Sequence, residues 1–432
     1  MLDIAYIREH PDEIKRGAER KHIDIDIDRL LQVDNRRRGL LKEVESLRAL
    51  KHSASARITG LKGDEKQRAI AEMKEVSARE KSLAAELKEA EDELARLMLL
   101  VPNPPADDVP DGVDERDSVV IRTWGAPPEF GFTPLDHVEL AERLDLIDLP
   151  RGAKVAGTRS YYLKNEGALL HWAVCRFALD WLLRKGFTPM AVPTIVRSEA
   201  MVGTGYFPGG EEQAYKIPED ELFLIGTAEV PLCAYHTDEI LSEDELPKHY
   251  VGYSSCFRRE AGTYGKDTRG VYRIHQFDKV EQVVICRNGL QFSLEEQEYI
   301  QKNAEEIVQA LGLPHRVVVM AAGDIGQGQV KKYDIETWMP GRNAYGETHS
   351  CSRFHEFQAR RLNLRYRTKT GELKFCHTLN NTAIASPRIL IPLLENNQQA
   401  DGSIVIPEAL RPYLNGMEVI LPKPVSPKPV HG

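Results

Sequence analysis

The sequence lacks the long apolar runs and paired cysteines that are typical of membrane proteins and disulfide-rich proteins. No apolar run approaches the roughly 18 residues of a membrane span, and the first residues, MLDIAYIREHP, hold no apolar segment of the kind found in secretory signals. The six cysteines are far apart and form no CxxC pair, which argues against a disulfide framework or a structural zinc site. We therefore expect a cytoplasmic protein with no membrane partner.

The common nucleotide-binding and hydrolytic motifs are also missing. There is no GxxxxGK[ST] loop, no strand–GxGxxG–helix unit, no HExxH and no G-x-S-x-G, which argues against Walker, Rossmann, zincin and α/β-hydrolase sites. The net charge of −9 argues against a general nucleic-acid binder, although a local basic region is compatible with it. Any nucleotide chemistry must therefore use arginines and acids on strands.

Residues 28–100 carry two heptad patterns that predict an antiparallel helical hairpin. Alternating spacings of four and three connect Val33, Arg37, Leu40, Val44, Leu47, Lys51, Ala54 and Ile58, and then Met73, Val76, Glu80, Leu83, Leu87, Ala90, Leu94, Leu97 and Val101. The break between them, at residues 59–64, leaves room only for a turn. At about 1.5 Å per residue the arm would be roughly 40–50 Å long. Its charged seam positions predict moderate stability.

The first helix of this arm is rich in basic residues. Between residues 36 and 68 there are ten Lys or Arg and four acids. A charged helix face is most often simply solvated; the alternative is that it lies along a phosphate backbone. Because no aromatic residues are interleaved, such contact would be to shape and phosphates. The candidate contacts are Arg36, Arg37, Lys42, Arg48, Lys51 and Arg57.

The proline-rich segment VPNPPADDVPDG, residues 101–112, predicts a linker and a domain boundary. We expect an N-terminal domain over 1–106, a second domain over 107–422, and a disordered Pro/Lys-rich tail over 423–432. Runs of strands with a few long helices indicate an antiparallel-dominated α+β fold in the second domain. Strands are expected near 222–226, 250–259, 272–285, 315–320 and 346–353, and helices near 134–148, 166–185, 291–311 and 388–397.

The most informative stretch is Cys256–Gln282, which predicts two strands joined by a glycine-bearing loop. Side chains alternate between the two faces of a strand. One face of the first strand therefore carries Cys256, Arg258 and Glu260, and one face of the second carries Arg273, His275, Phe277, Lys279 and Glu281. One interpretation is a solvated hairpin face. The other is a platform on which arginines hold phosphates and Phe277 stacks on a ring. His275 and Lys279 have no assignable role.

Three further segments carry candidate site residues. Thr227-Ala228-Glu229 follows an apolar strand, where it could hold an amino group, or Thr227 could be a helix N-cap. Glu347-Thr348-His349-Ser350 offers oxygen ligands of the kind that Mg²⁺ prefers. Ser386 is a predicted N-cap with Pro387 in the first helical turn. Arg388 would then lie at the positive end of a helix, which is better explained by a ligand than by stability.

Together these segments resemble the bacterial-type seryl-tRNA synthetases, class II aminoacyl-tRNA synthetases, over the whole chain. The class II motifs match residues 186–193, residues 257–260 with 273–277, and the segment ending at Arg388. The seryl-specific segments match at TAE 227–229, KVEQ 279–282, ETHSCS 347–352, FQARR 357–361 and LLENNQ 393–398. The resemblance implies an α+β fold: an antiparallel class II sheet with flanking helices, plus an N-terminal antiparallel coiled-coil arm.

The resemblance also implies roles for individual residues. Arg258 and Arg273 would be catalytic, Arg258 on the α-phosphate and Arg273 on the terminal phosphates. The implied ATP site comprises Arg258, Arg259, Glu260, Ile274, Phe277, Glu347, Thr348, His349, Ser350 and Arg388. Within it, Phe277 and Arg388 would sandwich the adenine, and Glu347 and Ser350 would ligate Mg²⁺. The implied serine pocket comprises Thr227, Ala228, Glu229, Glu281 and Thr382.

By the same resemblance, the substrates would be L-serine, ATP and tRNA(Ser), with tRNA(Sec) open, and the chain would form a homodimer. Two departures are seen: residues 380–383 read Asn-Asn-Thr-Ala where the family usually has glycine, and 348–349 and Arg353 are unusual. His349 would alternate onto the face of Glu347, or be structural. The rival hypotheses are a paralogue that aminoacylates a carrier protein, which would tend to lack the arm, and a non-catalytic scaffold.

Overall fold

The computed structural model describes residues 1–262, 265 and 269–423. The chain divides into two compact units, Met1–Pro104 and Pro105–Gly432, close to the boundary predicted after residue 106. Of the predicted tail, Lys423 is described and pairs with Glu166 at 2.9 Å; the rest lies outside the described residues. Within the described ranges, no helix combines the length and the apolar character needed to cross a bilayer.

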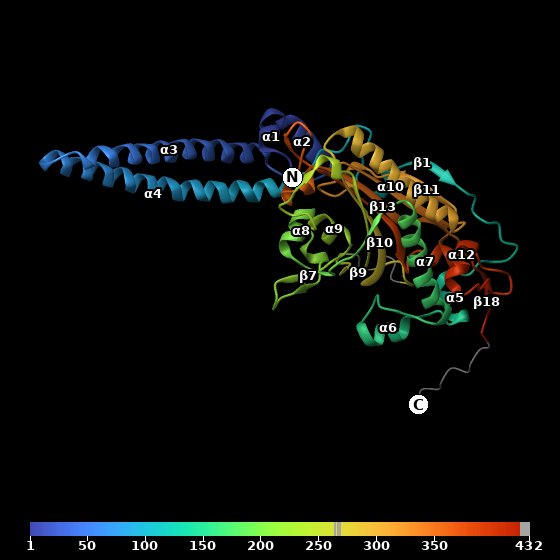
Figure 1. Ribbon diagram of the computed structural model, residues 1–432. Helices are drawn as coiled ribbons and strands as arrows, with labels where there is room; N and C mark the ends of the chain where they lie inside the picture. Colours follow the sequence, from blue (N-terminus) through green and yellow to red (C-terminus); the bar gives the residue numbers. More distant parts are fainter. Residues whose placement is uncertain (263–264, 266–268, 424–432) are drawn as a thin grey trace. The chain divides into compact units, whose positions relative to one another are not determined.

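The first unit contains the predicted helical hairpin, α3 (Ile27–Thr59) and α4 (Gly63–Leu100) (Figure 1). The heptad prediction is confirmed, because Val44 of α3 and Leu87 of α4 lie buried in one cluster between the helices. Two short helices, α1 (Ile4–Glu9) and α2 (Pro11–Arg20), bury Ile7 and Ile14 against the open end of the hairpin. The arm therefore has a core of its own.

Charged residues on the hairpin seam are paired across it. Glu80 of α4 receives Lys51 at 2.6 Å and Arg48 at 3.1 Å from α3. Arg29 and Glu93 pair at 2.7 Å nearer the base. Ion pairs that remain open to solvent on one side contribute only about 0–1 kcal/mol each, so they fix the register of the two helices more than they stabilise them.

The second unit is organised around an eight-stranded sheet in the order β1-β11-β12-β13-β16-β10-β9-β4. Neighbouring strands are antiparallel except β4 and β9, which are parallel. The strands are β1 (Val119–Trp124), β11 (His315–Val319), β12 (Lys331–Met339), β13 (Ala344–His355), β16 (His377–Ser386), β10 (Gln276–Cys286), β9 (Lys248–Phe257) and β4 (Thr188–Ala191). The predicted antiparallel-dominated α+β class is confirmed.

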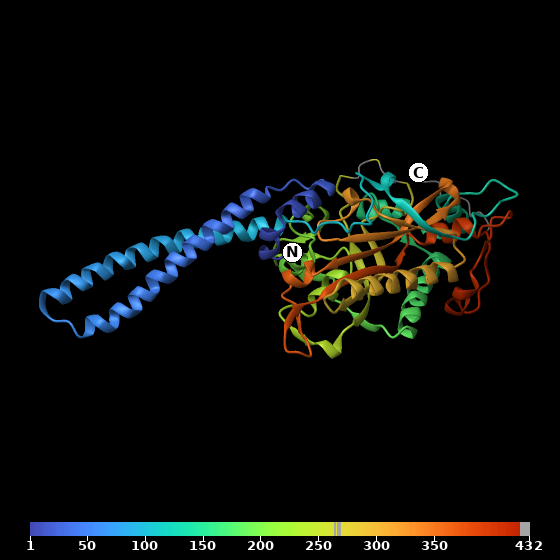
Figure 2. The ribbon, with the colours of Figure 1, turned by 90° about the horizontal axis from the view of Figure 1, so that it is seen from above.

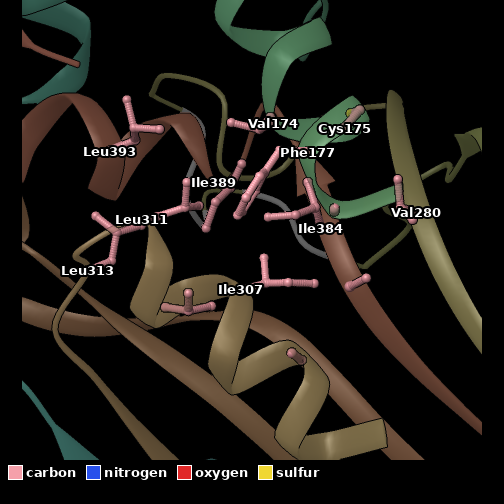
Figure 3. Close-up of a cluster of buried hydrophobic side chains, with 14 of the residues drawn as sticks. Val174, Cys175, Phe177, Val280, Ile307, Leu311, Leu313, Ile384, Ile389 and Leu393 are labelled. Carbon is pink, nitrogen blue, oxygen red and sulfur yellow. The ribbon is translucent and has the colours of Figure 1, made fainter. Parts of the chain in front are cut away.

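Two long helices, α7 (Asn165–Arg184) and α10 (Leu290–Ala310), pack against this sheet (Figures 1 and 2). Figure 3 shows Phe177 of α7, Ile307 of α10 and Ile384 of β16 in the buried cluster that they form. On β10, Val280 and Val284 join this cluster, whereas Lys279 and Glu281 line a cavity. Alternation therefore assigns one face of the strand to the core and the other to a site.

Smaller elements complete the second unit. The short helices are α5 (His137–Leu144), α6 (Leu149–Ala156), α8 (Ser198–Thr204), α9 (Glu229–Ala234), α11 (Phe357–Arg361) and α12 (Leu390–Asn396). The short strands are β2 (Ile147–Asp148), β3 (Tyr162–Leu163), β5 (Ile195–Arg197), β6 (Lys216–Ile217), β7 (Leu222–Leu224), β8 (Ile240–Ser242), β14 (Arg365–Arg367), β15 (Leu373–Phe375), β17 (Ile404–Val405) and β18 (Val419–Ile420).

Two local predictions near the site are wrong. The strand expected from residue 272 begins at Gln276, so Arg273 lies in the loop before it. Ser386 is not a helix N-cap: it ends β16, where it pairs with Asp278 of β10, and α12 begins only at Leu390. Arg388 therefore precedes the helix instead of lying in its first turn.

Candidate active site

A cavity of about 250 Å³ lies over the polar face of β10, β13 and β16. The predicted site residues that line it are Glu229, Arg258, Glu260, Ile274, Phe277, Glu281, Glu347, Thr348, Ser350, Thr382 and Arg388. Ten further residues line it without having been assigned to a site from the sequence, namely Tyr206, Val271, Tyr272, Lys279, Gln329, Lys332, Ser352, Asn380, Ala385 and Ser386. The cavity thus joins segments more than 180 positions apart in the chain, Tyr206 to Arg388.

The end of the β9–β10 hairpin places Arg258 beside an aromatic ring. The guanidinium carbon of Arg258 lies 5.2 Å from the centroid of the Phe277 ring. The backbone N–H of Arg258 donates to the carbonyl of His275 at 2.9 Å, and Nδ1 of His275 donates to the carbonyl of Arg258 at 3.0 Å. His275, which had no role on sequence grounds, therefore fixes the backbone at Arg258.

Arg273 and Glu260 form an ion pair at the same hairpin, with 3.6 Å between Nη1 and Oε2. Glu260 lines the cavity, whereas Arg273 does not. The backbone of Glu260 has a positive φ of 52°, a conformation that is uncommon for residues other than glycine. The sequence analysis predicted both residues at this site. However, Arg273 precedes β10, which begins at Gln276, so strand alternation does not determine the direction of its side chain.

Glu229 is a buried carboxylate held by two donors. The hydroxyl of Tyr206 donates to Oε2 at 2.9 Å, and Nε2 of Gln358 donates to Oε1 at 2.7 Å. Burial, together with the negative charge of Glu281, raises the pKa of Glu229 above its ordinary value. Such a site favours a bound cation, because a positive charge would offset the cost of two neighbouring buried carboxylates.

Glu281 is paired with Lys279 on the same face of β10, with 2.6 Å between Nζ and Oε2. Burial raises the pKa of Glu281, although the charge of Lys279 and a hydrogen bond with Thr382 act against this shift. Thr382 lies directly opposite Glu281 on β16. Lys279, the second residue without a predicted role, therefore balances the charge of Glu281.

A β-bulge decides which residues of β13 face the cavity. In the pairing with β12, Glu336 lies opposite Glu347 and Ile335 lies opposite His349, so Thr348 is the extra residue. A bulge resets the alternation of side chains: Glu347, Thr348 and Ser350 line the cavity. The expectation that His349 shares the face of Glu347 is therefore wrong.

His349 is a buried structural histidine. Its Nε2 donates to the carbonyl of Ala383 at 3.0 Å, and its Nδ1 lies 2.8 Å from Oγ1 of Thr348. Burial lowers the pKa of His349 to about 3, so the ring is neutral near pH 7. It orients Thr348 from behind the cavity instead of lining it.

The neighbouring strand β12 adds two charges that sequence reasoning missed. Nζ of Lys332 lies 3.1 Å from Oδ2 of Asp334, and Lys332 lines the cavity. Burial and the charge of Glu347 raise the pKa of Asp334 to about 7, although Lys332 opposes the shift. Burial also disfavours the anionic form of Glu347, but the charges of Arg388, Lys332, Arg258 and Arg273 bring its pKa below the ordinary value.

The oxygen atoms of Glu347 and Ser350 fit a cation that takes most of its ligands from a substrate. Both residues line the cavity, and Glu347 is held anionic by the surrounding guanidinium and ammonium groups. Among the described residues there is no group of three or more His, Cys, Asp or Glu side chains that could hold a metal unaided. This arrangement suits Mg²⁺, which often uses one or two carboxylates and substrate phosphates.

Five predicted residues do not line the cavity, namely Thr227, Ala228, Arg259, Arg273 and His349. Thr227 and Ala228 are buried beneath Glu229; Oγ1 of Thr227 accepts from the backbone N–H of Glu229 at 3.2 Å. The backbone N–H of Arg259 donates to Gln213 at 3.0 Å. Thr227 and Arg259 thus form hydrogen bonds that involve the main chain next to the cavity.

The six basic arm residues all lie on α3, with differing surroundings. Arg48 and Lys51 bind Glu80, Arg36 lies 3.7 Å from Glu86, and Arg37 lies 3.2 Å from Asp34. Lys42 and Arg57 are exposed, and within the described part of the chain they have no ion-pair partner. The positive charge of the helix is thus partly neutralised within the arm.

Comparison with known proteins identifies the family. The seryl-tRNA synthetase N-terminal domain model matches residues 1–105, and the tRNA synthetase class II core domain (G, H, P, S and T) model matches residues 214–397. The serine–tRNA ligase of Deinococcus radiodurans is 48% identical over 420 residues, covering 97% of this chain and 99% of that relative.

Two solved structures agree with this match. Seryl-tRNA synthetase from Pyrococcus horikoshii complexed with ATP has a TM-score of 0.92 and 40% identity, covering 98% of this chain and 100% of that one. Cytoplasmic serine–tRNA ligase from Naegleria fowleri in complex with AMP has a TM-score of 0.88 and 31% identity, covering 98% and 99%. The present chain belongs to the seryl-tRNA synthetase family of class II aminoacyl-tRNA synthetases.

Proposed function

We propose that this chain is a serine–tRNA ligase that activates L-serine with ATP and transfers the seryl group to the 3′ end of tRNA(Ser). The observation that carries this proposal is the composition of one cavity, which contains Arg258, Arg388 and Phe277 together with the buried carboxylates Glu229 and Glu281. Guanidinium groups and an aromatic ring suit a nucleoside triphosphate. Paired buried carboxylates suit the ammonium and hydroxyl groups of serine.

The serine pocket is formed by Glu229, Glu281 and Thr382, with Thr227 and Ala228 packed behind them. The ammonium group of serine would bind Glu229, which two donors already orient. Glu281 and Thr382 would pair with the serine hydroxyl. A site built to hydrogen-bond a hydroxyl strongly rejects analogues without it, because its own polar groups would be left unpaired. Alanine and glycine are thereby excluded, and threonine must be excluded by its extra methyl group.

ATP is bound by the cationic residues of the same cavity. Phe277 and Arg388 would hold the adenine ring between them, and Glu260 would accept a hydrogen bond from its amino group. Arg258 would contact the α-phosphate. Arg273 does not line the cavity, but its pair with Glu260 holds it beside the cavity, from where it would contact the terminal phosphates. Glu347 and Ser350 would hold Mg²⁺, which supplies charge neutralisation for the phosphates when bound. His349 is left out of the ligand contacts because it faces away from the cavity.

The first reaction is an in-line displacement at phosphorus. The serine carboxylate attacks the α-phosphorus of ATP, and the bond from the α-phosphorus to the oxygen that bridges the α- and β-phosphates breaks. The products are seryl-adenylate and pyrophosphate. The attacking carboxylate is already ionised at pH 7, so no general base is needed. Arg258 stabilises the negative charge that develops on the α-phosphate, and the remaining residues position the two substrates.

The second reaction transfers the seryl group from the adenylate to a hydroxyl of the terminal adenosine of tRNA, and AMP leaves. The helical hairpin α3–α4 is the proposed tRNA-binding arm, supported by its basic first helix and by the match of residues 1–105 to the family N-terminal domain. The presence of this arm argues against a paralogue that aminoacylates a carrier protein, since such a paralogue would tend to lack it. The location proposed for the protein is the cytoplasm.

We also propose a homodimer. Exposed apolar side chains cluster on α6, β3 and α7, where Val155 is 68%, Tyr162 46% and Trp172 60% exposed. They surround a second hollow of about 390 Å³. Contiguous exposed apolar surface of this kind is typical of protein interfaces. Sedimentation analysis of the wild type and Trp172→Glu tests this proposal: it requires a dimer for the former and a monomer for the latter.

Aminoacylation tests the proposed function directly. Radiolabelled serine is supplied to the protein with ATP, Mg²⁺ and total bacterial tRNA, with alanine and threonine as matched amino acids. The proposal requires acid-precipitable serine and background levels of the other two. Charging of the tRNA with another amino acid, or no charging with serine at saturating tRNA, would overturn the proposal.

A further inference from the structure

Arg388 is oriented by a contact set centred on Tyr272. The guanidinium carbon of Arg388 lies 4.5 Å from the centroid of the Tyr272 ring, and Nε of Arg388 donates to the Tyr272 carbonyl at 3.2 Å. Nη1 of Arg388 lies 3.3 Å from both the carbonyl oxygen and Oε2 of Glu347. Tyr272 therefore holds the guanidinium plane from the ring side, and β13 holds its edge.

Tyr272 is itself fixed to β13 and to a second arginine. Its hydroxyl donates to the carbonyl of Glu347 at 3.3 Å, which is also a partner of Arg388. The guanidinium carbon of Arg342 lies 4.6 Å from the centroid of the same ring. Gly346 leaves room for the ring: a Cβ at Gly346 would lie 3.3 Å from Cε2 of Tyr272 and 3.0 Å from Met339.

The charges make this arrangement informative. Two guanidinium groups beside one ring repel each other, and Arg388 is a partly buried cation that forms an ion pair with Glu347 at 3.3 Å. A cation over an aromatic face is stabilised more strongly when it is desolvated. A ring that keeps the guanidinium plane in one orientation would therefore favour stacking of the other face of that plane on a flat ligand.

We propose that Tyr272 and Arg342 are positioning residues that preorganise Arg388 to stack on the adenine of ATP. This inference rests on the proposed function, since it concerns the same nucleotide site. Tyr272 would act through its ring, with a smaller contribution from its hydroxyl. Arg342 would act from the exposed end of η5 (Pro340–Arg342) by polarising and covering the Tyr272 ring.

The test measures serine-dependent ATP–pyrophosphate exchange in four variants, and in Arg388→Lys with and without Tyr272→Leu, alongside direct binding of ATP by calorimetry. Tyr272→Leu removes the ring, Tyr272→Phe removes only the hydroxyl, and Arg342→Gln removes the outer cation. Tyr345→Leu is the matched control, because Tyr345 lies on β13 outside the cavity and its ring also packs against a guanidinium group, that of Arg316 at 4.9 Å.

For Tyr272→Leu we expect KM and Kd for ATP to rise about tenfold, with KM for serine unchanged. Tyr272→Phe should retain most ATP affinity, Arg342→Gln should lose about two- to threefold, and Tyr345→Leu should match the wild type. Combined with Arg388→Lys, the Tyr272→Leu change should have little further effect, because residues that act through one another are not additive.

Three outcomes would overturn the inference while the proposed function stands: wild-type KM for ATP in Tyr272→Leu, equal losses for ATP and serine, or full additivity with Arg388→Lys. Because Arg342 is exposed, an unchanged KM in a normally folded Arg342→Gln protein would remove it from the proposal even if Tyr272→Leu failed to fold. Absence of serine-dependent exchange in the wild type would instead refute the proposed function.

Discussion

Nζ of Lys279 lies 2.6 Å from Oε2 of Glu281, and the two side chains are only 7% and 2% exposed. Both residues belong to the polar face of β10, so the pair is built into a single strand without long-range help. A buried pair of this kind is strongly destabilised when one partner is removed. The ammonium group of Lys279 therefore makes it possible for the Glu281 carboxylate to be buried in the proposed serine pocket.

The first prediction is that Lys279→Met weakens serine binding and destabilises the protein. Glu281 would be left buried without its cation, which typically costs about 3–5 kcal/mol. Its pKa, already raised by burial, would rise further, so activity on the acid side would be lost at higher pH than in the wild type. Urea unfolding and the pH profile of kcat/KM for serine measure this, with Lys279→Arg as control. A wild-type acid limb would contradict it.

A second prediction concerns the hydroxyl of Tyr206, which donates to Glu229 at 2.9 Å. Tyr206→Phe removes a hydrogen bond to a charged group, worth about 1.5–3 kcal/mol. We expect KM for serine to rise about tenfold or more while KM for ATP stays the same. Tyr235→Phe, at a 58% exposed tyrosine, is the control for loss of a hydroxyl. An increase in KM for ATP alone would contradict the prediction, because it would assign Tyr206 to ATP binding instead of serine binding.

A third prediction links stability to pH through Asp278. His171, Tyr253 and Ser255 donate to its carboxylate, at 3.1, 2.5 and 2.7 Å. Although burial acts in the opposite direction, these bonds lower the pKa of Asp278 to about 2. The folded value lies below the unfolded value, so this stability is present above about pH 4 and is lost as pH falls toward about 2.

Asp278→Asn should therefore lower the free energy of unfolding at pH 7 by about 2 kcal/mol. The difference from the wild type should shrink as the pH is lowered from 4 to 2. Denaturant unfolding at a series of pH values measures it. A difference that stays constant down to pH 2 would show that the ionised carboxylate is not the source of the stability.

A fourth prediction separates the arm from the chemistry. Lys42→Ala with Arg57→Ala should raise KM for tRNA. It should also flatten the slope of the logarithm of the binding constant against the logarithm of salt concentration by about 0.7–0.9 for each phosphate that the variant no longer neutralises. Pyrophosphate exchange should not change. Lys81→Ala with Lys88→Ala, two exposed lysines of α4, is the matched control. Equal losses in the two double variants would indicate a general charge effect.

Local patterns predicted the fold and part of the site. The heptads of α3 and α4 predicted the hairpin because both the spacing and the turn are encoded within neighbouring residues. On β10, alternation correctly predicted that Phe277, Lys279 and Glu281 face one way. These features depend on the period of a helix or strand, which can be read from the chain directly.

Features that depend on partner strands could not be predicted. The bulge at Thr348 arises from the pairing of β13 with β12, and nothing in ETHS distinguishes a regular strand from a bulged one. Ser386 precedes a proline and an apolar run, as an N-cap would, yet its pairing with Asp278 extends β16. No strand was predicted over residues 331–339, so the sequence analysis assigned no role to Lys332, which lines the cavity, or to Asp334, which pairs with it.

The most direct test of the central claim is serine-dependent ATP–pyrophosphate exchange in the wild type and in Arg258→Ala. The account predicts exchange with serine in the wild type and a loss of about a hundredfold or more in the variant, because Arg258 stabilises charge that develops in the transition state. Thermal unfolding of both proteins serves as the control for folding. Wild-type exchange in a folded Arg258→Ala protein would contradict the assignment of this cavity as the site of serine activation.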